Sequence, residues 1–253
     1  MVESREAIRK DLMRRWFAVA ISVGFATTLI DMQWLGEGHF PNFDELQQLA
    51  RLVTALIAVV LSWEGYFFSI ESKPLKTTPR FIIDFTLVLL YMVLLYTSKI
   101  PTFWLYLHAF SFLLYITWDL LSIKEFRSTY SCDPMPSGLP TRQIYLGGFL
   151  GREGVYRGPI ITLSWALFFV GLAGSQLIFG PRNSFILAPF AIAGLLLYRS
   201  DKTIASKAMA GGASAHGMTW RAGTIILLLL GVAFVSVMLP DQTITSLSNC
   251  FNS

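Results

Sequence analysis

Seven long apolar segments dominate this chain, and a helix needs a run of about 20 apolar residues to cross the hydrocarbon core of a bilayer. The sequence therefore predicts an all-α integral membrane protein with about seven transmembrane helices. Apolar residues make up 54% of the chain and charged residues only 14%, which leaves little material for a soluble domain. The predicted spans cover residues 16–35, 52–70, 81–98, 102–123, 159–179, 184–198 and 222–239.

The basic residues between these spans predict the orientation of the chain. With the N-terminus in the cytoplasm, every lysine and arginine except Arg51, Lys99 and Arg182 falls on the cytoplasmic side. Positively charged loops resist translocation, so we predict a cytoplasmic N-terminus and an external C-terminus. The same bias accounts for the net charge of +4, which needs no partner beyond the anionic headgroups of the lipid bilayer. The sequence contains no direct nucleic-acid-binding motif.

The chain divides into three predicted parts. Residues 1–123 form a four-span bundle that is rich in large aromatic and acidic residues. Residues 124–158 form a cytoplasmic loop, and the alternative to a free loop is a segment that lies in the membrane interface or re-enters the membrane. Residues 159–253 form a three-span packing module with a short external tail, because its spans lack charged interiors and are rich in small residues that let helices approach closely. The span at 184–198 is short and contains Pro189, so a re-entrant segment is the alternative there.

Ionisable side chains within the first four spans are the candidate functional residues. Such side chains are expensive inside a bilayer and usually face the interior of a bundle or water. At about 100° per residue, His108, Tyr115 and Asp119 share one helix face, and Asp84 and Tyr91 share another. These polar stripes predict an ion path across the membrane. The predicted path runs from Asp31 at the outer end to Glu64, Asp84 and Asp119 in the cytoplasmic half, with Tyr91, His108 and Tyr115 along it.

The alternative for the same stripes is a set of hydrogen bonds and ion pairs that hold the bundle together. Asp84 lies four residues after Arg80 and is able to pair with it, and Asp119 is near enough to Lys124 to do the same. Glu64 has no local partner, which makes it the strongest candidate for ion coordination. The sequence leaves open whether the stripes face water or one another.

Catalytic, cofactor and metal motifs are missing from the sequence. It has no nucleophile elbow, no H-E-x-x-H motif and no phosphate-binding loop, so we predict neither an enzyme nor a bound cofactor. Cys132 and Cys250 fall on opposite sides of the membrane and have no metal-ligand spacing, so we predict no metal site. Basic residues of the cytoplasmic loop contact either lipid headgroups or an anionic regulator, and these are Arg142, Arg152 and Arg157.

We expect the protein to be an ion channel or a pore-forming subunit, cation-conducting and gated through the loop at 124–158. Seven helices are few for a pore within one chain, so we expect a homo-oligomer, with a cytoplasmic regulator docking on the loop. The alternatives are a secondary transporter with an intramembrane carboxylate site, and a membrane scaffold or sensor that partners a cytoplasmic protein. Compact loops without an N-x-Ser/Thr sequon are typical of a bacterial cytoplasmic membrane protein.

Overall fold

The computed structural model describes residues 5–32, 34, 41–72, 77–125, 157–179, 184–209 and 218–238. These residues contain seven α-helices and a short 3-10 turn, and no strand lies among them, so the all-α prediction is confirmed. The elements are α1 (Arg5–Asp31), α2 (Phe43–Ser72), α3 (Thr78–Tyr96), η2 (Thr97–Lys99), α4 (Trp104–Glu125), α7 (Arg157–Phe179), α8 (Ser184–Met209) and α9 (Met218–Met238).

Five of these helices are long and apolar enough to cross a membrane, namely α1, α2, α3, α4 and α7. Their outer faces carry large apolar side chains, among them Ile30, Leu177 and Ile178, which are more than two-thirds exposed. Lipid contact accounts for such exposure, since acyl chains are as apolar as these side chains. The apolar stretch of α9, Trp220–Ser236, is shorter. The membrane crossing of α8 and α9 therefore stays a prediction.

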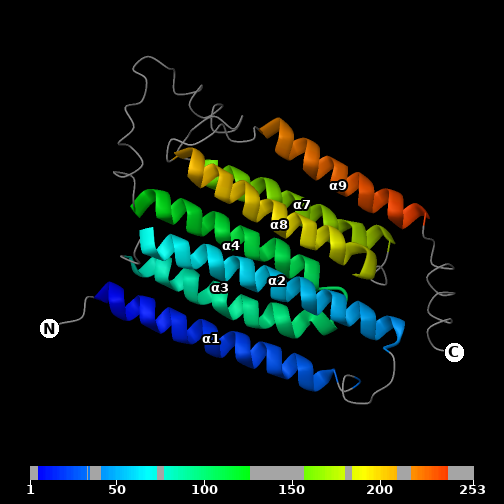
Figure 1. Cartoon of the computed structure of the whole chain (residues 1–253), viewed down its shortest axis with the longest axis horizontal. Helices are drawn as coiled ribbons and strands as arrows, with labels where there is room; N and C mark the ends of the chain where they lie inside the picture. Colours follow the sequence, from blue (N-terminus) through cyan, green and yellow to red (C-terminus); the bar gives the residue numbers. More distant parts are fainter. Residues whose placement is uncertain are drawn as a thin grey trace.

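The helices lie alongside one another in a single bundle (Figure 1). In it, α4 packs against α3 and α7, and α2 packs against α8. The helix α1 contacts α3, and α9 contacts α7 and α8, so these two helices flank the bundle. The first four helices and the last three thus share an extensive interface through the α4–α7 and α2–α8 contacts.

Three helices, α1, α2 and α8, extend well beyond the predicted spans. The helix α2 begins at Phe43, where the backbone N–H of Asn42 donates to Glu45 Oε2 and the backbone N–H of Glu45 donates to Asn42 Oδ1, at 2.7 and 2.9 Å. This reciprocal pair is a capping box that fixes the start of the helix. The helix α8 continues through Pro189 to Met209 as one continuous helix.

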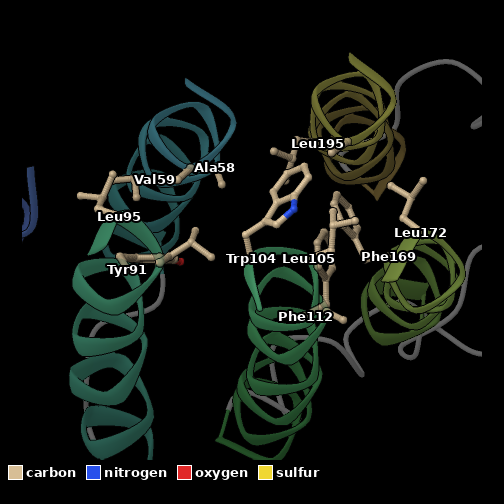
Figure 2. Packing of buried hydrophobic residues seen from close by; sticks show 14 of the residues in the cluster. Ala58, Val59, Tyr91, Leu95, Trp104, Leu105, Phe112, Phe169, Leu172 and Leu195 are labelled. Atoms are coloured by element: carbon tan, nitrogen blue, oxygen red, sulfur yellow. The ribbon is translucent and has the colours of Figure 1, made fainter. Parts of the chain in front are cut away.

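Aromatic rings fill the contact between α4, α7 and α8. Trp104 extends from α4 toward Leu195 of α8 (Figure 2). Phe112 of α4 stacks on Phe169 of α7 with 4.9 Å between ring centroids, and it meets the edge of Tyr198 of α8 at 4.8 Å. Close ring packing of this kind contributes to the contact among the three helices. A cluster of charged residues lies beyond it, along α8.

Candidate functional site: a charge cluster on α8

Three charged side chains of α8 reach three different helices. Arg199, Asp201 and Lys202 lie within a single turn, and at about 100° per residue Asp201 points away from the other two, which are about 60° apart. Each therefore meets an oppositely charged residue on a different neighbour. We call the six residues the α8 charge cluster: Arg199 with Glu64 of α2, Lys202 with Asp119 of α4, and Asp201 with Arg221 of α9.

Asp119 of α4 is bound by side chains from two other helices, α7 and α8. Its Oδ2 accepts hydrogen bonds from Lys202 Nζ and from Thr162 Oγ1 of α7, both at 2.6 Å. The side chains of Asp119 and Lys202 are only 12% and 20% exposed. The partner of Asp119 is thus Lys202, 83 residues away, rather than the nearby Lys124 that the sequence indicates. Gly158 of α7 lies beside this pair, which brings the backbone of α7 close to it.

The Asp201–Arg221 pair is buried between α8 and α9. Arg221 donates through Nε and Nη2 to the two carboxylate oxygens, at 2.5 and 3.2 Å, in the bidentate geometry that guanidinium and carboxylate groups favour. Trp165 Nε1 of α7 also donates to Asp201, at 3.3 Å. The predicted spans at 159–179, 184–198 and 222–239 contain no charged residue, but α8 continues beyond its apolar stretch and brings Asp201 into the bundle.

The Glu64–Arg199 pair lies at the surface of the bundle. Arg199 Nε donates to Glu64 Oε2 at 3.2 Å, and the two side chains are 24% and 53% exposed, respectively. A Cβ placed on Gly65 would lie 2.9 Å from Arg199 Nη1, so the glycine lets the guanidinium lie against the backbone of α2. Glu64, which has no local partner, is therefore paired by a residue 135 positions away.

Asp84 and Tyr91 lie on α3, in the interior. Asp84 is buried, and Tyr66 Oη of α2 donates to its Oδ2 at 3.3 Å. Arg80, one turn earlier, is also buried and lies 4.7 Å from the ring centre of Trp118. The hydroxyl of Tyr91 is hydrogen-bonded to that of Tyr115 of α4, so the facing stripes of α3 and α4 meet each other directly.

The remaining residues of the predicted path lie apart from the α8 charge cluster. His108 is buried, with Nδ1 2.7 Å from Trp104 O and its ring stacked on Phe169, as expected for a packed interior histidine. Asp31 pairs with Lys99 at 2.6 Å, at the opposite end of α3 from Asp84, which is about 22 Å along the helix axis.

The predicted basic residues of the cytoplasmic loop lie mostly outside the part of the chain that the structure describes. Arg142 and Arg152 lie outside the described residues, and Arg157 is described only as the first residue of α7. Within the described ranges, no group of three His, Cys, Asp or Glu side chains is placed to hold a metal ion.

Sequence reasoning missed the basic half of the cluster, together with Asp201 and Thr162. Arg199, Lys202 and Arg221 fall between the predicted spans and were therefore interpreted as loop residues. The signal that could have identified Arg199, Asp201 and Lys202 is the stretch after Tyr198, which has no glycine or proline before Gly211 and so favours continuation of the helix.

The fold and its outer surface define the class of the protein: an all-helical bundle with five helices suited to a membrane and apolar faces on its outside. Comparison with known proteins gives no narrower assignment, because no family model, no curated protein and no solved structure matches the chain.

Proposed function

We propose that this protein is an ion-coupled secondary transporter in which Asp119 binds the coupling cation. The observation that carries the proposal is the pair of 2.6 Å contacts that Lys202 and Thr162 make with one carboxylate oxygen inside the bundle. A charge at this depth has to be compensated, so the carboxylate binds either the lysine or an incoming cation. Thr162 Oγ1 remains beside it as a neutral ligand in both states.

The Asp119 site is built from three helices, which ties ion binding to helix position. The carboxylate comes from α4, the hydroxyl from α7 and the ammonium group from α8. Movement of α8 away from α4 withdraws Lys202, and a proton or a sodium ion then neutralises Asp119. A cation that binds only one arrangement of the helices shifts the population toward that arrangement. Coupled transport requires this link between ion occupancy and conformation.

The Asp119→Asn variant tests this proposal in proteoliposomes that contain a pH-sensitive dye or a sodium tracer. Loss of the charge removes an interaction of about 1.5–3 kcal/mol with the cation. We therefore expect the ion flux to fall by about tenfold or more. The matched control is Asp31→Asn, which removes the carboxylate of the pair at the outer end of the bundle. Equal flux from the wild type and Asp119→Asn would overturn the proposal.

A cation channel is the second candidate, and the exposed side chain of Glu64 favours it. A ring of copies would place this carboxylate on a water-filled axis, where acidic side chains select cations. In planar bilayers under a KCl gradient, we expect Glu64→Gln to reduce cation selectivity, while Glu64→Asp keeps the charge and preserves it. Unchanged currents from a correctly assembled Glu64→Gln protein would remove Glu64 from the conduction path.

The proposal also includes the setting of the protein. We place it as a homo-oligomer in a bacterial cytoplasmic membrane, with the loop at 124–158 as the docking segment for a cytoplasmic regulator. The exposed charged pair on α2 and α8 supports the homo-oligomer, because a lone chain would present that pair to lipid.

A further inference from the structure

The Glu64–Arg199 pair lies at a depth where charged groups are costly. Asp119 is five residues before Lys124, the last residue of the apolar segment of α4, which is about 7 Å along the axis. Lys202 pairs with Asp119, and Arg199 lies one further turn toward the centre of the membrane. Glu64 itself is three residues before Phe67, the last residue of the apolar segment of α2, so the Glu64–Arg199 pair lies about 5–10 Å inside the apolar layer.

Among the three ion pairs of the α8 charge cluster, this pair differs in being open to the outside of the bundle. The other two pairs are enclosed by α4, α7, α8 and α9, whereas more than half of the Glu64 side chain is uncovered. Its neighbours on the same two helices are exposed and apolar: Val60 lies one turn before Glu64, and Leu196 lies one turn before Arg199. This surface of α2 and α8 thus combines an acid, a base and two large apolar side chains.

A surface of this composition is complementary to itself. A two-fold axis brings the same patch of two subunits face to face, so that residues on one helix meet residues on the other. Rotation about such an axis places the acid of each copy opposite the base of its partner. The resulting four charges alternate in sign and are shielded from lipid, while the apolar side chains pack around them.

We propose that α2 and α8 form a two-fold interface with a second copy of this chain, in which each Glu64 contacts Arg199 of the partner subunit. This inference rests on the homo-oligomer in the proposed function and names its interface. Gly65 contributes by leaving room for the guanidinium against α2, which holds it in place for both carboxylates.

Charge reversal in mixed subunits tests the interface. Glu64→Arg gives a chain with two positive charges at this site, and Arg199→Glu gives a chain with two negative charges. Each variant alone places like charges together in any two-fold dimer, so we expect its dimer affinity in lipid nanodiscs to fall by about tenfold or more. Full-length chains of the two variants with different tags, when co-expressed, regain attraction only between copies. We expect them to form a heterodimer with about the affinity of the wild-type dimer.

The matched control is the reversed pair Asp31→Lys with Lys99→Asp, which lies at the outer end of the bundle and leaves dimerisation unchanged. If a single reversal fails to fold, Leu196→Cys in a Cys132→Ser, Cys250→Ser background provides a second test, since it forms a disulfide between two copies across this interface.

Three results would overturn the interface: a monomeric wild type, a co-expressed pair that associates no better than either variant, or a larger ring whose current depends on Glu64. The last result assigns this surface to a water-filled path. The readout is subunit stoichiometry, so its failure leaves transport at Asp119 standing, and a negative flux measurement leaves the interface standing.

Discussion

The Arg221→Ala protein is expected to be about 3–5 kcal/mol less stable than the wild type, because the substitution leaves Asp201 as an uncompensated charge inside the bundle. Among the described residues, Asp201 then keeps only the N–H of Trp165 at 3.3 Å, a single neutral donor in place of a bidentate guanidinium. The measurement is the free energy of unfolding in mixed micelles, followed by helical circular dichroism as denaturing detergent is added.

Two controls separate the buried charge from a general sensitivity to substitution. Lys99→Ala breaks the partly exposed pair with Asp31, and we expect it to cost no more than about 1 kcal/mol. The double variant Asp201→Leu, Arg221→Met replaces both charges by apolar groups and should recover much of the lost stability, since no unpaired charge remains. An Arg221→Ala protein as stable as Lys99→Ala would show that water reaches Asp201.

The positions of the helices could be predicted from hydropathy, and their ends could not. An apolar run shows where the chain is able to lie in lipid, whereas a helix ends where its backbone groups find other partners. The start of α2 depends on the capping box of Asn42 and Glu45, a local signal that the hydropathy of the span does not contain. The end of α8 lies beyond Lys202 because nothing in that stretch breaks a helix.

The acidic half of the candidate site could be predicted because an acid within an apolar run stands out in the sequence. Glu64, Asp84 and Asp119 were identified in this way. Their partners depend on which helices are neighbours, and sequence spacing carries no information on that. Arg199 and Lys202 lie 135 and 83 positions from the acids that they bind. The contacts α2–α8 and α4–α7–α8 bring them together, and these contacts depend on the packing of the whole bundle.

In the proposed transport mechanism, the position of α8 decides whether Lys202 or a cation binds Asp119, and Gly194 lets α8 approach α7 closely. A Cβ on Gly194 would overlap Cε1 of Phe168 of α7, whose ring is fully buried. We expect Gly194→Val to lower the free energy of unfolding by about 3 kcal/mol or more, because overpacking forces the ring and the helix apart. Gly194→Ala should have an intermediate effect. Both are measured by the same detergent titration.

Gly174 provides the matched control, because it lies on α7, and a Cβ there meets nothing within 4 Å. We expect Gly174→Ala to leave the stability unchanged or raise it by up to about 1 kcal/mol, through the better helix propensity of alanine. A Gly194→Ala protein that is less stable but still folds also tests the proposed role of α8 in transport. If displacing α8 from α7 also pulls Lys202 away from Asp119, this variant should show altered cation flux while Gly174→Ala does not. A Gly194→Ala protein with wild-type stability and flux would mean that the α7–α8 contact is loose and that α8 is positioned by its ion pairs alone.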